Sequence, residues 1–191
     1  MTFFINSKGF AIQSCMKAND ADDIKIINTT KEDLKEILWL FEQVLQWQGK
    51  NGYKVWNFID KAALEKDIEE RLQYKITRHD NILCIFTVGY RDPFTWGERD
   101  QSDAIYLHRI VTNPLFKGQR QFENVLWWTK QLARLNNLPY IRMDTWADNS
   151  KIIRYYKSFG FEFVGNYKTP DAEALPLQNR NLHVALLELK V

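Results

Sequence analysis

The stretch RIVTNPLFKGQRQFENVLWWTKQL, residues 109–132, carries the pattern that decides the fold. It begins with apolar and β-branched residues, turns at Asn113-Pro114, and passes a lone glycine, Gly118, before a longer periodic segment. Within residues 121–136, apolar or small residues recur at helical spacing: Phe122, Val125, Leu126, Thr129, Leu132 and Ala133. The stretch predicts a buried strand, a turn and a helix, with Phe122 on the inward face of that helix.

The turn in this unit places the N-terminus of the helix close to the end of the strand. The first amides of a helix lack intrahelical partners and carry the positive end of the dipole, so such a start can bind an anion. Lys117 and Arg120 add two cations there. A strand, a turn and a single glycine are common in α/β proteins, however, so the loop also fits a purely structural turn.

Outside this unit, the chain alternates between segments of strand and helix character. The predicted strands are residues 24–28, 74–78, 81–90, 104–112, 140–146, 161–167 and 182–191. Four helices are predicted. The first begins after a capping pattern at Thr30, the second runs from about 57 to 74, and the others cover residues 121–136 and 149–159. Residues 91–103 and 168–181 are predicted loops. The central strand–helix–strand unit implies a parallel pair inside a mixed sheet with helices on both faces.

Length and composition bound the possible classes of protein. At 191 residues the chain fits one domain, residues 24–191, preceded by an N-terminal extension, residues 1–23, that is a leader or an extra edge element. A net charge of +2 argues against a nucleic-acid partner, and no apolar stretch is long enough to cross a membrane. Two cysteines, Cys15 and Cys84, fit a reducing cytoplasm, and Cys84 in ILCIFTV is predicted to be a small core residue.

Three motifs in the second half of the chain occur in a recognisable order. They are VTNPLFKG (111–118), DTWADN (144–149) and YKSFGF (156–161). Together with the order of the other elements, they resemble the GNAT superfamily of acyl-CoA-dependent N-acyltransferases over about residues 24–191. The resemblance implies an α/β (α+β) fold: a mixed, mostly antiparallel central sheet with a splayed parallel pair, a bulge, and helices on both faces.

The resemblance also implies an activity, namely transfer of an acetyl group from acetyl-CoA to a primary amine by direct attack through a tetrahedral intermediate. The acceptor would be a small-molecule or peptide amine. The residues implied to bind the cofactor are Ile110, Val111, Thr112, Lys117, Gly118, Gln119, Arg120, Gln121, Phe122, Asn149 and Tyr156. In this scheme the backbone amides of residues 110–112 steady the oxyanion, and the Tyr156 phenol protonates the departing thiolate. A helix cap for Asn149 and a core aromatic for Tyr156 are the structural alternatives.

The phosphate loop departs from the family pattern. Arg120 and Phe122 occupy positions where the family has glycine, which is preferred there because a Cβ crowds the phosphate. Arg120 can compensate by pairing with phosphate, and an inward Phe122 leaves the amides free, whereas an outward Phe122 blocks them. These departures support a second hypothesis, a non-catalytic CoA-binding or regulatory module on the same fold. A nucleotide-binding α/β protein is a third, but the loop lacks the lysine–serine/threonine pair of a nucleoside triphosphatase.

The general base is predicted on the strand before the loop. His108 matches a histidine position of one branch of the family, Tyr106 matches the second such position, and an imidazole, with its ordinary pKa of about 6.5, suits neutral pH. A structural, hydrogen-bonded histidine is the alternative. No histidine, cysteine or carboxylate cluster has metal-ligand spacing, so no metal is expected.

The acceptor would be framed by residues 47–56, 91–100 and 170–179. These loops and their borders supply aromatic and acidic side chains that suit a small amine with an apolar body: Trp47, Tyr53, Trp56, Phe94, Trp96, Glu98, Asp100, Asp103, Asp171 and Glu173. Exposed charges and loop-pinning aromatics are the structural alternative. Trp127, on the polar side of its helix, suggests a homodimer contact or a loop that covers it.

Overall fold

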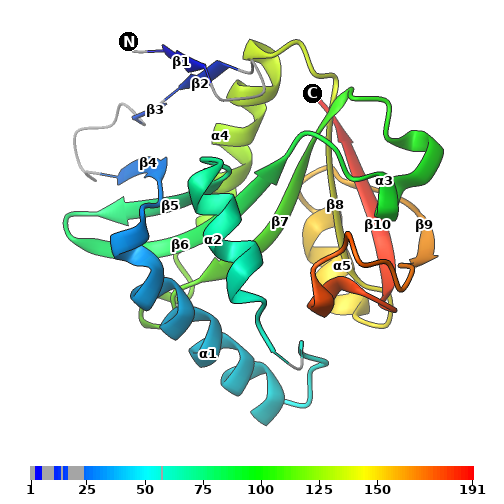
Figure 1. The fold of residues 1–191 in the computed structure, drawn as a ribbon, viewed down its shortest axis with the longest axis horizontal. Helices are drawn as coiled ribbons and strands as arrows, with labels where there is room; N and C mark the ends of the chain where they lie inside the picture. Colours follow the sequence, from blue (N-terminus) through cyan, green and yellow to red (C-terminus); the bar gives the residue numbers. More distant parts are fainter. Residues whose placement is uncertain (1–2, 6–10, 14, 17–23, 57) are drawn as a thin grey trace.

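The computed structural model describes residues 3–5, 11–13, 15–16, 24–56 and 58–191. Its strands are β1 Phe3–Ile5, β2 Ala11–Gln13, β3 Cys15–Met16, β4 Ile24–Asn28, β5 Gln73–Arg78, β6 Asn81–Gly89, β7 Ala104–Thr112, β8 Tyr140–Trp146, β9 Glu162–Lys168 and β10 His183–Lys190. Eight of them form one sheet in the order β3-β4-β5-β6-β7-β8-β10-β9, and β1 and β2 form a separate pair (Figure 1). Every neighbouring pair in the large sheet is antiparallel except β7 and β8, which are parallel.

Helices cover both faces of this sheet. The α-helices are α1 Leu34–Lys50, α2 Lys61–Glu69, α3 Pro93–Trp96, α4 Gln121–Leu135 and α5 Ser150–Lys157, and short 3₁₀ turns occupy Lys31–Asp33, Gly97–Arg99, Pro114–Phe116 and Leu177–Asn179. Helices α1 and α2 pack on one face, and α4 and α5 pack on the other (Figure 1). The predicted fold class, a mostly antiparallel mixed sheet with one parallel pair between helices, is confirmed.

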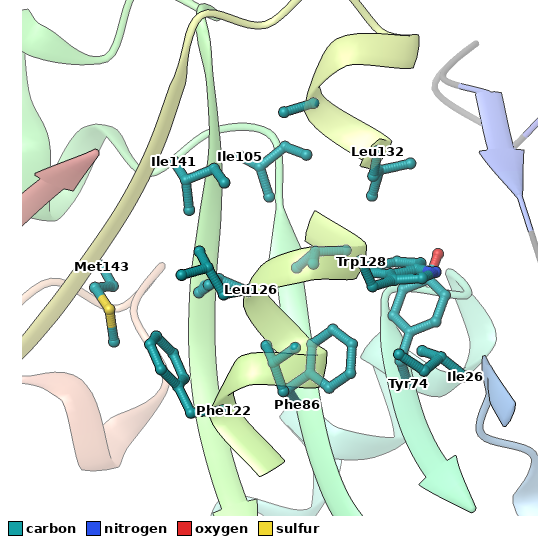
Figure 2. Packing of buried hydrophobic residues seen from close by; sticks show 14 of the residues in the cluster. Ile26, Tyr74, Phe86, Ile105, Phe122, Leu126, Trp128, Leu132, Ile141 and Met143 are labelled. Atoms are coloured by element: carbon teal, nitrogen blue, oxygen red, sulfur yellow. The ribbon is translucent and has the colours of Figure 1, made fainter. Parts of the chain in front are cut away.

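The largest hydrophobic core lies between α4 and the sheet. Figure 2 shows Phe122 and Leu126 of α4 among side chains of β7 and β8, with Trp128 beside Tyr74. The Trp128 and Tyr74 ring centroids are 4.4 Å apart, and both rings are buried. Cys84 belongs to the same core, so the prediction of a small core residue is confirmed, and burial raises the pKa of its thiol to about 12.

Two predicted element boundaries are wrong. The second helix was expected from about 57 to 74, but α2 begins at Lys61, after Asp60 accepts a hydrogen bond from the Ala63 amide at 3.0 Å. It ends at Glu69 because Arg71 adopts a left-handed φ of 58° and the chain enters β5 at once. The predicted loop 91–103 contains the short helix α3.

The N-terminal stretch adds strands at the border of the molecule. β3 extends the sheet by pairing with β4, in line with an extra edge element, and β2 contacts α4. Most of the predicted extension 1–23 lies outside the described residues.

Trp127 of α4 is half-buried and packs against the large core. Within the described ranges, every helix is too short or too polar to cross a membrane.

Candidate active site

The parallel strands β7 and β8 are paired over only part of their length. Their register runs from Ala104 opposite Tyr140 to Leu107 opposite Met143. Beyond this point β7 continues along β6, and β8 continues along β10, with no further register between the two. We call residues 104–107 and 140–143 the paired half, and residues 108–112 and 144–146 the open half. The splayed parallel pair expected from the sequence is therefore present.

A bulge in β7 begins where the strands separate. His108 lies opposite Thr87 of β6, and Val111 lies opposite Ile85, so β7 has one residue more than its partner over this interval. Arg109 takes up the difference with a φ of 47°, a left-handed conformation that is uncommon for residues other than glycine. Its buried side chain pairs with Asp67 of α2, and burial lowers the pKa of the guanidinium to about 10.

The open half borders a cavity of about 950 Å³. Of the residues proposed from the sequence, those that line it are His108, Ile110, Val111, Asn149 and Tyr156. Residues Thr112 and 117–122 are not part of this lining. Helix α2 and the loop before β10 form other walls, so the cavity extends well beyond the gap between the two strands.

The loop before α4 keeps a backbone that suits glycine. Gly118 has a φ of 86°, and Arg120 has a φ of 49° and caps α4 in the left-handed conformation. The Glu123 amide donates to the Arg120 carbonyl at 2.9 Å, and the Arg120 guanidinium pairs with the Glu123 carboxylate at 2.5 Å. Arg120 thus has the left-handed backbone conformation that glycine adopts most easily, and its side chain is largely exposed.

Phe122 points into the core, as the helical periodicity predicted. It is 5% exposed, and its ring lies 4.9 Å from that of Tyr156 and 5.0 Å from that of Phe159. The phenyl ring therefore packs in the core beneath the start of α4, in the inward orientation. The first amides of the helix, at Gln121 and Phe122, have no carbonyl one turn back within the helix.

The remaining loop side chains contact other parts of the chain. The Lys117 ammonium lies 4.2 Å from the ring of Trp47 in α1, which itself stacks on Tyr53. Arg78 donates to the Gln119 side chain at 3.1 Å. The Gln121 side chain is buried and accepts a hydrogen bond from Asn124. Lys117 and Arg120 are thus the cations nearest the start of α4 among the proposed residues, and each already has an intramolecular partner.

Asn149 and Tyr156 combine structural contacts with a place at the cavity. Asn149 caps α5 by accepting a hydrogen bond from the Ile152 amide at 3.1 Å, so the predicted cap is present. Tyr156 packs edge-on against Phe122 and also lines the cavity. Burial raises the pKa of its phenol above the ordinary value of 10, which keeps the proton on the oxygen at neutral pH.

His108 faces two carboxylates that sequence spacing did not bring together. Asp92 Oδ2 lies 4.0 Å from His108 Nε2, and Asp144 of β8 completes a group whose polar atoms all lie within 4.8 Å of one another. Burial raises the pKa of the Asp92 carboxyl, and nearby His108 acts to lower it. Burial, reinforced by the charge of Asp92, raises the pKa of Asp144 to about 6.

These three side chains are spaced more widely than a small metal ion requires. Zinc ligands at about 2.0–2.1 Å from the ion lie roughly 3.4 Å apart in a tetrahedral site. His108 Nε2 lies 4.0 Å from Asp92 Oδ2, so these two ligand atoms would have to move closer together to hold such an ion. As arranged, the histidine and the carboxylates are close enough to influence one another's charge without a direct hydrogen bond.

Several buried polar atoms without hydrogen-bond partners belong to residues that line the cavity. Among the described residues these atoms include Thr87 Oγ1, Asp92 Oδ2 and Arg109 Nε. Thr87 lies opposite His108 in the β6–β7 register, and Arg109 follows it in β7. Such atoms are costly in a core, and their concentration beside a cavity is typical of a functional site.

The paired half has a different set of polar contacts on the same sheet face. Arg142 donates to Asp103 at 2.7 Å, to Glu188 at 2.7 Å, and to the Tyr106 hydroxyl at 3.1 Å. The Tyr106 hydroxyl in turn donates to Asp100 at 2.9 Å, and Tyr106 is fully buried. Tyr106, the second position matched to the family's histidines, is therefore part of this network and is not among the residues that line the cavity.

Some of the loop residues predicted to frame an acceptor line the cavity, and others belong to the network around Arg142. Trp56 and Glu173 line the cavity. Trp96, Asp100 and Asp103 instead belong to the buried contacts around Tyr106 and Arg142. These three residues are not among those that line the cavity, and Trp96 of α3 is buried.

Comparisons with known proteins agree with this architecture. No protein-family model matches the chain. A Bacillus subtilis protein described as "Uncharacterized N-acetyltransferase YesJ" is 24% identical over 153 residues, which covers 76% of this chain and 85% of that protein. A GNAT-family acetyltransferase from Listeria monocytogenes superposes with a TM-score of 0.73 at 16% identity over 100% of both chains. The PaiA N-acetyltransferase of Thermoplasma acidophilum, in complex with coenzyme A, gives a TM-score of 0.64 at 14% identity over 88% of this chain and 99% of the other.

The split parallel pair, the bulge and the helix that follows the first strand of the pair belong to a fold that this chain shares with these acetyltransferase structures. The chain therefore has the fold of the GNAT superfamily, and the resemblance seen in its motifs is confirmed.

Proposed function

We propose that the protein is an acyl-CoA-dependent N-acetyltransferase that moves an acetyl group from acetyl-CoA to a primary amine. The observation that carries this proposal is the open half of the β7–β8 pair, with a cavity that has His108 on one wall and Tyr156 on another. The relatives support it, since each is named an acetyltransferase and one structure contains coenzyme A.

The open edge of β7 and the start of α4 are suited to hold the donor. Backbone groups of residues 108–112 have no register partner in β8, so this edge is available to an extended chain such as the pantetheine arm. The inward Phe122 leaves the first amides of α4 available to a pyrophosphate. Lys117 and Arg120 supply cations there, with Arg120 exchanging Glu123 for a phosphate oxygen. Asn149 lines the cavity beside the arm.

The chemistry needs a base, an oxyanion site and an acid. His108 accepts a proton from the acceptor amine, whose nitrogen then forms the bond to the acetyl carbon through a tetrahedral intermediate. Backbone amides in residues 110–112 stabilise the oxyanion. As the carbon–sulfur bond breaks, Tyr156 donates its proton to the thiolate, and its raised pKa ensures that the proton is present at neutral pH.

The acceptor side of the cavity suits a cationic amine. Asp144 and Glu173 place carboxylates in the lining, and Trp56 adds an aromatic surface. This supports a small-molecule or peptide amine as the acceptor.

The test has a binding step and a turnover step. We expect acetyl-CoA to raise the melting temperature and a panel of amines to release free thiol from acetyl-CoA. Tyr156→Phe should reduce thiol release about 100-fold, while Tyr155→Phe, a change to an exposed tyrosine one residue earlier, should not. Absence of any melting shift at millimolar acetyl-CoA would exclude the proposal.

A non-catalytic CoA-binding or regulatory module is the second candidate. Its support is the Arg120–Glu123 pair, which holds a carboxylate where the family places a phosphate. A melting shift with acetyl-CoA, together with no thiol release from any amine, would favour this candidate.

A further inference from the structure

Asp92 is held rigidly by the helix that follows it. It is the N-cap of α3, where its Oδ1 accepts a hydrogen bond from the Thr95 amide at 3.3 Å. Pro93 occupies the first helical position, where its fixed φ favours the turn. The side chain is 9% exposed, so its orientation is set by the surrounding protein.

The second oxygen of Asp92 has no hydrogen bond among the described residues. An unpartnered buried carboxylate oxygen is costly unless a cation lies close. The nearest basic atom is His108 Nε2 at 4.0 Å. The neighbouring arginines are engaged elsewhere, because Arg91 pairs with Asp100 and Arg109 pairs with Asp67.

We propose that Asp92 is a positioning residue for His108, whose protonated ring it stabilises while the acceptor amine gives up its proton. This inference rests on the proposed function. In the step, one N–H bond of the amine breaks, the proton passes to the neutral imidazole, and Asp92 remains a carboxylate. The oxygen that lacks a partner in the resting site then faces a cation.

Asp144 has a different role from Asp92. Both residues line the cavity, but Asp144 is half-buried, whereas Asp92 is buried and its Oδ2 atom is covered by protein. The carboxylate that acts on the ring from the protein side is therefore Asp92, and Asp144 faces the acceptor. The other charged groups that line the same cavity are Asp60, Lys66, Asp67, Glu70, Arg91, Arg109, Glu173 and Arg180.

The mutual influence of the two groups agrees with this assignment. The charge of His108 acts to lower the pKa of Asp92 against the opposing effect of burial.

The test is a proton NMR titration of the three histidine rings, with the His108 signal assigned by its loss in His108→Gln. In Asp92→Asn, which keeps a cap acceptor for Thr95, the midpoint of the His108 titration should fall by about one pH unit. His79 and His183 should not move. Asp171→Asn, which changes an exposed carboxylate outside the cavity lining, is the matched control and should leave all three midpoints unchanged. Asp92→Ser, which also retains capping ability, replaces Asp92→Asn should that variant fail to fold.

Turnover supplies the second readout. For Asp92→Asn, kcat should fall about 10-fold and the acidic limb of its pH profile should move about one unit lower, with KM for acetyl-CoA unchanged. An unmoved His108 midpoint overturns the inference even in an active enzyme. A shifted midpoint in a protein that turns over no amine supports the Asp92–His108 coupling and counts against the proposed function alone.

Discussion

The two halves of the β7–β8 pair place polar groups on the same sheet face with opposite results. In the paired half, Arg142 and Tyr106 lie opposite each other, and their polar atoms are bonded to Asp100, Asp103 and Glu188. In the open half, the next residues on that face are His108 and Asp144, which border a cavity. A step of two residues along each strand therefore leads from a fully bonded polar network to an incompletely bonded one.

The difference follows from strand separation. Where the strands pair, side chains meet at fixed distances, and a buried arginine can satisfy several carboxylates at once. Where they separate, His108 and the carboxylates are held 4.0 Å or more apart by different elements, and Asp92 Oδ2 has no hydrogen bond. The polar groups of the paired half are therefore bonded to one another, whereas those of the open half lie beside a cavity with incomplete bonding.

Breaking the paired half should cost the most. Arg142→Met leaves Asp103 and Glu188 without their cation in a largely buried setting. We expect unfolding free energy to fall by about 3 kcal/mol, since removal of one partner leaves an uncompensated charge. Urea denaturation measures it. Lys31→Met, which removes an exposed ion pair with Glu69, is the control and should leave the midpoint unchanged.

Breaking the open half should leave stability intact and reduce activity. We expect His108→Gln to lower kcat about 100-fold, because the amine loses its general base. The melting temperature and the KM for acetyl-CoA should stay close to those of the wild type. A variant with full activity would show that His108 is only structural, whereas a large loss of stability would remove the contrast with Arg142.

Much of the fold could be predicted from local sequence patterns. The strand Tyr140–Trp146 and the strand Ala104–Thr112 have the predicted bounds, since alternating or continuous apolar runs ended by polar residues define them. The C-terminal end of α2 was missed because it depends on the left-handed Arg71, for which the sequence has no glycine. Helix α3 was missed although Asp92-Pro93 is a typical helix start.

The site was only partly predictable, because two of its members depend on long-range register. Tyr106 lies opposite Arg142, so His108 and Asp144, each two residues further, share a face. The pair could be predicted if the register of β7 and β8 were known, but the sequence of either strand alone does not determine that register. Asn149 and Tyr156 were found because short motifs contain them, and His108 because its position on the strand before the loop matches a histidine position of the family. Their roles stay predictions.

The same substitution should have opposite effects in the two halves. The pKa of Asp144 is raised to about 6, above an unfolded value of about 3.9, so the folded state favours its protonated form. The carboxyl therefore destabilises the fold as pH rises from about 4 to about 6. At pH 7.5, Asp144→Asn should raise unfolding free energy by about 1 kcal/mol, allowing for its partial exposure, and the gain should vanish near pH 4.

Asp103→Asn is the counterpart in the paired half. It weakens the bond from Arg142 and should lower unfolding free energy by about 1 kcal/mol at pH 7.5. Thermal unfolding of both variants at pH 4 and pH 7.5 measures the contrast. The same sign for both at pH 7.5 would mean that Asp144 is stabilised by contacts like those of Asp103.

The smallest effect concerns the loop that leads to the open half. Arg120 adopts a left-handed φ of 49°, which glycine tolerates without strain, so Arg120→Gly should raise unfolding free energy by about 0.5 kcal/mol despite the loss of an exposed ion pair with Glu123. Gly118→Ala, at a φ of 86° with open space around the Cβ position, should lower it by about 1 kcal/mol. Denaturation midpoints and the KM for acetyl-CoA separate backbone from side chain. A KM several-fold higher in Arg120→Gly would mean that the guanidinium binds phosphate, whereas an unchanged KM would leave the helix amides as the main anion site.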